Sequence, residues 1–206
     1  MKKVVVLSLL LMLFSCQNKE VLLPKENETV LMNVKNYSTV YFFFKTEEKD
    51  TLVEVERNDL INSNNWLFNI DKRLPLRKVI LEIKKLQAKK AASTHKNEIS
   101  GDYFTYISVV KNTKAFLPFT KIKYMLEKPD FDIPYFYLDR NDLVHFKDEV
   151  FSKNELQAYI DKQISPIFFA YDKGMSFDKY IKWKFFVMHL VAHNEIIINQ
   201  NKEYIY

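Results

Sequence analysis

The sequence predicts an α+β protein built from two similar β-β-α-β-α-β units, each a small sheet with helices on one face. The first observation is a repeat: residues 68–80 recur as residues 169–181, at a constant offset of 101, with five of thirteen positions identical. The second is that each copy follows a short apolar run and leads into an apolar helical pattern. Since the repeat occurs only twice, it indicates one duplication and not a solenoid array.

Each copy of the repeat is typical of a buried strand, a tight turn and a helix. An Asp-Lys pair stands at the same place in both copies, and Asp favours such turns because its carboxylate can bond to nearby backbone. The five identical pairs are Phe68 and Phe169, Asp71 and Asp172, Lys72 and Lys173, Lys78 and Lys179, and Ile80 and Ile181.

The first unit is expected to span residues 30–128. Its helix should begin near Pro75, because the missing N–H of proline costs nothing in the first turn of a helix. Apolar residues at a 3-4 spacing then predict one buried helix face. Aromatic and β-branched runs predict strands at 30–34, 38–44, 51–55, 66–70 and 104–110, the last in a hairpin with 115–117, and residues 58–65 form a helical turn at best.

The second unit is expected to span residues 129–206, because Pro129 disfavours helix just before it. Ser152 and Glu155 have the spacing of a capping box and predict the start of a helix. The expected elements are a hairpin at 135–146, a helix at 153–162, a strand at 167–171, a helix at 177–193 and a strand at 195–199. The strands at 104–110 and 195–199 end their units and look exposed, and each would be an open sheet edge unless the two units pair.

The N-terminus is typical of a lipoprotein export signal. Lys2 and Lys3 precede an apolar run, Val4–Phe14, which ends in Ser15 and Cys16. The run is shorter than the roughly 20 residues of a membrane span. We expect residues 1–15 to be cleaved, Cys16 to carry the lipid and residues 16–29 to form a tether. The alternative is a buried thiol inside an uncleaved anchor.

Composition argues against several classes of function. Removing residues 1–15 lowers the formal net charge from +5 to +3, which gives nucleic-acid binding little support. The chain has only two glycines, Gly101 and Gly174, so a phosphate-binding loop is absent and no cofactor is expected.

A pair of histidines is the one pattern that suggests an enzyme. His189 and His193 are spaced i, i+4 on a predicted helix and could bind zinc, as in a metal-dependent hydrolase. A third ligand is missing from the pattern, and the alternative is ordinary histidines favoured by the helix end. We therefore expect no metal and no catalysis.

Both copies of the repeat carry a family resemblance. The pattern Asp71-Lys72-x-Leu74-Pro75-Leu76-x-x-Val79-Ile80 resembles the strand-turn-helix of the ExbD/TolR biopolymer-transport family. In the second half, residues 137–146 resemble the opening hairpin of the soluble domain of that family, and residues 152–156 the start of its first helix. The similarity covers residues 135–206 well and 40–110 loosely.

The resemblance implies a lipid-anchored binding or scaffold protein of the cell envelope, on the periplasmic face or the outer-membrane surface, with energy-transduction proteins as possible partners. Soluble domains of this family pair as homodimers, so we expect the two units to pair by a pseudo-twofold within one monomer. The family also has a transmembrane helix with a proton-coupling aspartate, which Val4–Phe14 lacks.

Asp71, Lys72, Asp172 and Lys173 are the candidate partner contacts by this resemblance. The alternative for each aspartate is that it only turns the chain between strand and helix. The alternative function is a surface lipoprotein that uses the duplicated fold for unrelated ligand capture.

Overall fold

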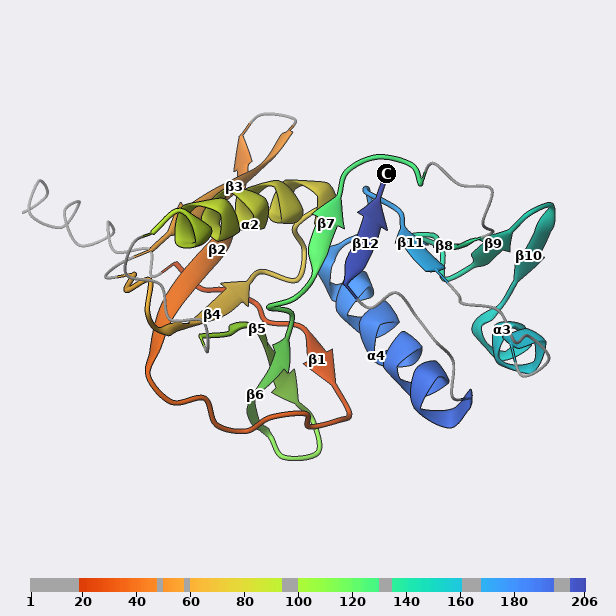
Figure 1. The fold of residues 1–206 in the computed structure, drawn as a ribbon, viewed down its shortest axis with the longest axis horizontal. Coiled ribbons are helices and arrows are strands. Elements are labelled where there is room, and N and C mark those ends of the chain that lie inside the picture. Colours follow the sequence, from red (N-terminus) through yellow and green to blue (C-terminus); the bar gives the residue numbers. More distant parts are fainter. Residues whose placement is uncertain are drawn as a thin grey trace, which may run out of the picture.

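The structure is a computed structural model of the 206-residue chain, and it describes residues 19–47, 50–57, 60–93, 100–129, 135–160, 168–194 and 201–206, with only the backbone of 193 and 194. It contains two mixed sheets of six strands each, with three helices packed on them. The sheets stand side by side, and helix α4 runs between them (Figure 1). The predicted architecture of two similar sheet units is confirmed.

The first sheet has the order β1-β5-β4-β2-β3, and β6 pairs with β5. Its helix is α2. These elements are β1 (Lys25–Glu26), β2 (Tyr37–Glu47), β3 (Asp50–Glu56), β4 (Asn65–Ile70), α2 (Leu76–Ala91), β5 (Asp102–Ser108) and β6 (Thr113–Pro118).

The second sheet has the order β10-β9-β8-β11-β12-β7. The capping box that starts α3 is formed, with the Ser152 N–H bonded to Glu155 Oε2 at 2.7 Å and the Glu155 N–H bonded to Ser152 Oγ at 3.4 Å. The elements are β7 (Lys123–Met125), β8 (Tyr135–Leu138), β9 (Val144–Phe146), β10 (Glu149–Phe151), α3 (Lys153–Ile160), β11 (Phe168–Tyr171), α4 (Phe177–Asn194) and β12 (Lys202–Ile205).

The two sheets share a common arrangement of four strands. In each, an antiparallel strand (β3 or β9) pairs with the first of three parallel strands, β2-β4-β5 or β8-β11-β12. The registers also agree, because Phe42 faces Ile70 in the first sheet and Leu138 faces Tyr171 in the second. In both units the strand with the repeat therefore lies in the centre.

One hydrophobic core joins the two units. Phe104 of β5 stacks on Phe119 at 3.8 Å between ring centroids, and it also contacts Phe177 at 5.3 Å and Tyr180 at 6.1 Å, both from α4. All four rings are buried. Helix α4 thus packs on the first sheet as well as on its own, and burying apolar surface from both units stabilises their contact.

Some predicted strands are wrong. Residues 30–34 form no strand, and only Leu31 makes a bridge, to Phe116. Of the two strands that would be open edges without further pairing, β5 pairs with β4, β1 and β6. The other, at 195–199, lies outside the described residues, and the strand that the structure describes after it is β12, which lies between β11 and β7. For residues 60–64, the structure shows a turn and no helix.

The described part of the expected tether belongs to the first unit. Strand β1 pairs with β5 in parallel, and the Lys72 N–H donates to Leu22 O at 2.8 Å. The expected boundary at 128 also divides elements that pair, because β7 joins the second sheet by its pairing with β12. The chain therefore passes to the second unit before β7.

The shared core predicts that the units unfold together. The only two tryptophans, Trp66 in β4 and Trp183 in α4, are both fully buried and report one unit each. In Trp183→Phe and in Trp66→Phe protein, the fluorescence of the remaining tryptophan and far-UV circular dichroism should give coincident transitions within each variant. Phe104→Ala should lower the free energy of unfolding by about 3–5 kcal/mol in both. Val110→Ala, at a residue 68% exposed, is the control with an expected effect within about 0.5 kcal/mol. Two separate transitions, with only one shifted by Phe104→Ala, would contradict the shared core.

Candidate functional site

The first Asp-Lys turn is closed by its own aspartate. Asp71 is fully buried, and its Oδ1 accepts the Arg73 N–H at 3.0 Å and Arg73 Nε at 2.9 Å. Its Oδ2 accepts Arg73 Nη2 at 2.8 Å and the Leu22 N–H at 3.2 Å. Burial by itself would raise the pKa of Asp71, but the hydrogen bonds from Arg73 and Leu22 outweigh it and hold the pKa below its usual value.

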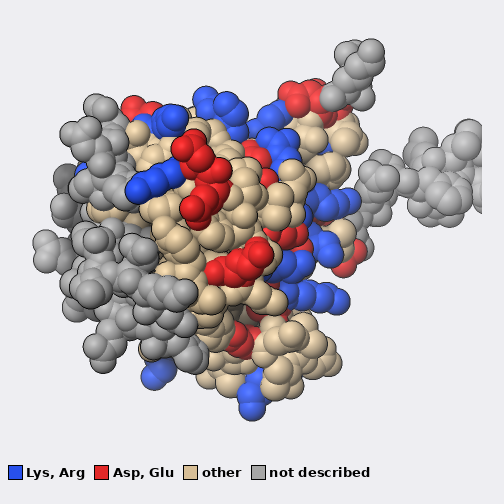
Figure 2. Space-filling view, turned by 90° about the vertical axis from the view of Figure 1, so that its right-hand side faces the viewer, with Lys and Arg blue, Asp and Glu red and all other residues tan. Residues whose placement is uncertain are grey.

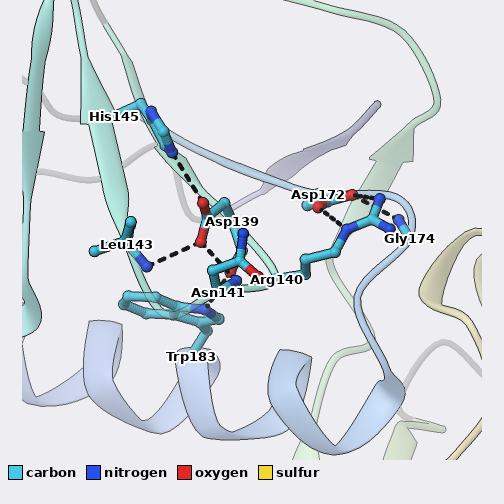
Figure 3. Close-up of polar contacts among 8 residues, drawn as sticks. All are labelled: Asp139, Arg140, Asn141, Leu143, His145, Asp172, Gly174 and Trp183. Carbon is cyan, nitrogen blue, oxygen red and sulfur yellow. Dashed lines mark hydrogen bonds and ion pairs between the residues drawn. The ribbon is translucent and has the colours of Figure 1, made fainter.

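The second turn has the same arrangement, except that the guanidinium comes from a residue outside the turn. Asp172 Oδ1 accepts the Gly174 N–H at 2.7 Å, as Asp71 accepts the N–H of Arg73. Its guanidinium partner comes from elsewhere, since Arg140, which follows β8, donates to Asp172 from Nε at 2.5 Å and from Nη2 at 2.8 Å (Figure 3). A Cβ on Gly174 would collide with the Arg140 guanidinium. Glycine therefore leaves the space into which Arg140 reaches.

The two turns bond directly to each other, and the bonds are reciprocal. The Leu76 N–H donates to Met175 O and the Phe177 N–H to Leu74 O, both at 2.8 Å. A second pair joins the Arg77 N–H to Lys173 O and the Asp178 N–H to Lys72 O, both at 3.0 Å. Pro75 and Ser176 form the bridge between them. Within each pair, the donor and acceptor of one bond stand 101 positions from the donor and acceptor of the other, so each bond is repeated with the two turns exchanged. This is the pattern of an isologous contact around a local twofold axis.

These four bonds also cap two helices. The first N–H groups of a helix have no partner inside it. Here the first two N–H donors of α2 and the first two of α4 are satisfied by carbonyls of the opposite turn. Pro75 provides no side-chain cap for α2. The contact between the units therefore replaces the N-cap of α2 and contributes to that of α4, where Ser176 Oγ accepts the Lys179 N–H at 3.3 Å.

The four predicted contact residues are thus brought together, at the contact between the two units. Asp71 and Asp172 are buried in their turns, so both carboxylates shape the backbone, as the structural alternative proposed for them. Lys72 and Lys173 contribute carbonyls to the reciprocal bonds. The Lys173 side chain is exposed, and that of Lys72 is half-buried.

A third aspartate, which lies beside this site, was not predicted from the sequence. Asp139 Oδ1 accepts the N–H groups of Asn141 at 2.7 Å and Leu143 at 2.9 Å, and Oδ2 lies 3.0 Å from His145 Nε2 (Figure 3). Burial opposes ionisation, but the bond from His145 and the two N–H donors lower the pKa of Asp139. The Trp183 Nε1–H donates to the Asp139 carbonyl at 3.3 Å and fixes the hairpin to α4. The signal in the sequence was the turn-forming run Asp139–Asp142.

Asp139 and His145 resemble a general-base pair, in which an aspartate orients an imidazole. Since Asp139 also accepts two N–H groups of the turn, its first role is to shape the hairpin that positions Arg140. His145 is half-exposed and contacts the ring of Tyr137 at 5.8 Å between centroids. Burial and the nearby Asp172 raise the pKa of Tyr137 to about 12, so this tyrosine is protonated near neutral pH.

The two helix-end histidines are not brought together as a described site. The His189 Nε2 contacts Glu28 Oε1 of the N-terminal segment, while the side chain of His193 lies outside the described residues. In the part of the chain that the structure describes, no three His, Cys, Asp or Glu side chains are grouped as metal ligands. No described helix is long and apolar enough to cross a membrane.

Charged side chains of both signs are interspersed at the end of the molecule formed by the second unit. Figure 2 shows acidic and basic groups among uncharged surface, with lysine and arginine most frequent toward the upper and right-hand margins. This distribution agrees with the small net charge of the chain.

Comparison with known proteins identifies no relative. No family model, no curated protein and no solved structure matches the chain.

The second turn predicts a non-additive pair of substitutions. Gly174→Ala should displace the Arg140 guanidinium from Asp172, and Arg140→Ala removes it. Each should lower the free energy of unfolding by about 1 kcal/mol, because the guanidinium is half-exposed and solvent weakens the pair. The double variant should lose no more than the larger single effect in a double-mutant cycle. Gly174→Arg combined with Arg140→Ala should recover stability by recreating the first turn. Additive losses would show that Arg140 does not occupy the space beside Gly174.

The turns also predict a pH dependence. Asp71, Asp139 and Asp172 have pKa values below their usual range in the folded protein. Their stabilisation is therefore present above the unfolded pKa of about 3.9 and is lost as pH falls through the folded pKa. The free energy of unfolding should decrease from about pH 5 downward, and Asp172→Asn should flatten that decrease. Asp148→Asn, at an exposed residue, is the control. An unchanged slope for Asp172→Asn would contradict the assigned role of its carboxylate.

Proposed function

We propose that the protein is a lipid-anchored, non-catalytic binding or scaffold protein of the cell envelope, in which two units resembling the periplasmic domain of ExbD/TolR proteins are paired within one chain. The observation that carries the proposal is the set of reciprocal bonds between the turns at Asp71 and Asp172. The residues that resemble the family motif are the ones that make this contact.

Joining the two units changes what the contact can do. The fraction of a protein that forms a homodimer depends on its concentration, whereas covalent linkage raises the effective concentration of the two halves to about millimolar. The self-complementary surface is then occupied inside the chain. In this proposal the lipid-free protein is a monomer, and its partners bind elsewhere.

The surfaces left for partners are the outer parts of the sheets. Strands β3 and β10 each pair with one neighbour only, so each has an unpaired backbone edge among the described elements. The Lys173 side chain, beside the reciprocal bonds, is an exposed charge that a partner can contact. Envelope energy-transduction proteins are the partner class that the resemblance suggests, without proton coupling, because Val4–Phe14 has no aspartate.

Unrelated ligand capture by a surface lipoprotein is the second candidate function. It is favoured by a cleft of about 570 Å³ to which both halves of the chain contribute.

The lipid anchor is tested at Cys16. Cys16→Ser should block lipid attachment and leave the precursor uncleaved, as measured by intact mass and by membrane fractionation. Ser15→Ala keeps a small residue before the cysteine and should leave both unchanged. A Cys16→Ser protein that still carries lipid would contradict the anchor.

The pairing and the partner class are tested on protein that begins at Gln17, which retains every described residue. Light scattering should give the mass of a monomer. When the protein is immobilised and incubated with an extract of the cell envelope it comes from, it should retain energy-transduction proteins. Lys173→Glu should weaken their retention relative to Lys111→Glu. A dimer mass would contradict the internal pairing, and equal retention by both variants would remove Lys173 from the partner surface.

A further inference from the structure

A cleft lies where the end of the first sheet meets α4 and the second sheet. Its volume of about 570 Å³ is within the roughly 300–1,000 Å³ typical of small-molecule sites. Its walls come from the segment at the end of β6, from the C-terminal half of α4 and from strands β11 and β12. The apolar part of the lining consists chiefly of Val30, Leu117, Phe169, Val187, Met188 and Val191.

The apolar lining is partly open to solvent. Met188 is 39% exposed on α4, one turn before Ala192, which also faces the cleft. Leu117 and Phe169 are buried at its inner end. An elongated apolar molecule could therefore remove apolar surface from water along α4, which favours binding.

The floor of the cleft is polar, but its groups already have partners. Lys184 Nζ is paired with Glu203 Oε1, and both side chains are largely buried. Glu203 Oε2 accepts the Tyr180 hydroxyl at 2.5 Å, and that hydroxyl lies 3.3 Å from the hydroxyl of Tyr124. Burial and the nearby Glu203 raise the pKa of Tyr124 well above its usual value, so it stays protonated. A ligand would gain little by bringing a charge to this floor.

The rim of the cleft has lysines without a described carboxylate partner. Lys121 and Lys202 are exposed and line the cleft together with a neighbouring groove of about 1,000 Å³. That groove adds Lys123 and Lys84, and its carboxylate, Asp102, is already bonded to Lys90 at 2.7 Å. The rim therefore has an excess of positive charge next to an apolar cavity.

We propose that this cleft binds a fatty acid, with its acyl chain along α4 and its carboxylate at Lys121 and Lys202. The volume suits a single chain, and the apolar lining suits hydrocarbon. The lysines favour an anionic head group over a neutral or cationic one, because unlike charges attract and like charges repel. The inference deepens the ligand-capture function. It depends neither on the lipid at Cys16 nor on the family resemblance.

Photo-crosslinking of the full-length protein in its own membrane tests this binding. The probe is a fatty acid with a diazirine in its chain, and the matched probe is the fatty alcohol of the same chain. The crosslinked peptides are then identified by mass spectrometry. The acid should label the peptides that contain Val187 to Val191 and Leu117, and the alcohol should label them several-fold less.

Charge reversal at the rim tests the position of the carboxylate. Lys121→Glu with Lys202→Glu should reduce labelling by the acid about tenfold, because two attractions become repulsions at an exposed site. Lys111→Glu with Lys114→Glu makes the same charge change on exposed positions outside the cleft and should leave labelling unchanged. Equal melting temperatures of the two variants show that both are folded.

The proposal would be overturned by labels spread over the whole surface, by equal labelling by acid and alcohol, or by equal labelling of the two double variants. If a crosslinked protein partner prevents labelling of the α4 peptide, that result would also overturn the proposal and would assign the cleft to the partner. None of these results depends on whether Cys16 is lipidated, so failure here is distinct from failure of the proposed anchor.

Discussion

The structure depends on two helix N-termini that satisfy each other. A helix begins with N–H groups that have no partner of their own, and a buried beginning must find acceptors nearby. In this protein the acceptors of α2 are carbonyls of the turn before α4, and the reverse is also true. Separating the two units would leave four donors without these acceptors and would expose the rings of Phe104 and Phe177, so the contact couples hydrogen bonding to core packing.

The aspartates shape the backbone so that this exchange is possible. Each accepts the N–H two residues further on and is neutralised by a guanidinium, which allows a buried carboxylate to stay charged. The two copies obtain the guanidinium differently, from Arg73 in one and from Arg140 in the other. Backbone contacts around the local twofold are thus retained while the side chains that support them differ. This difference ties the β8–β9 hairpin to the contact in the second unit only.

The repeat predicted the centre of the fold because its signals are local. An Asp-Lys turn, Pro75 and apolar spacing determine a strand, a turn and a helix within thirteen residues, and the capping box did the same for Ser152 and Glu155. Pairing between distant strands was less accessible. Strands β1 and β7 are two and three residues long, with no periodicity to read, and they extend the sheets beside β5 and β12. Arg140 could not be matched to Asp172 because nothing in the spacing of the two relates them, although a glycine at the position of Arg73 was visible.

Hydrogen exchange at four backbone amides tests the mutual capping most directly. The first amides of a helix normally exchange fast, since they lack intrahelical partners. Mutual capping predicts that the amides of Leu76, Arg77, Phe177 and Asp178 exchange only through global unfolding, with the same free energy as the central strands β4 and β11. Fast exchange of these four amides while β4 and β11 stay protected would show that the units separate without unfolding, and would contradict mutual capping of the two helices.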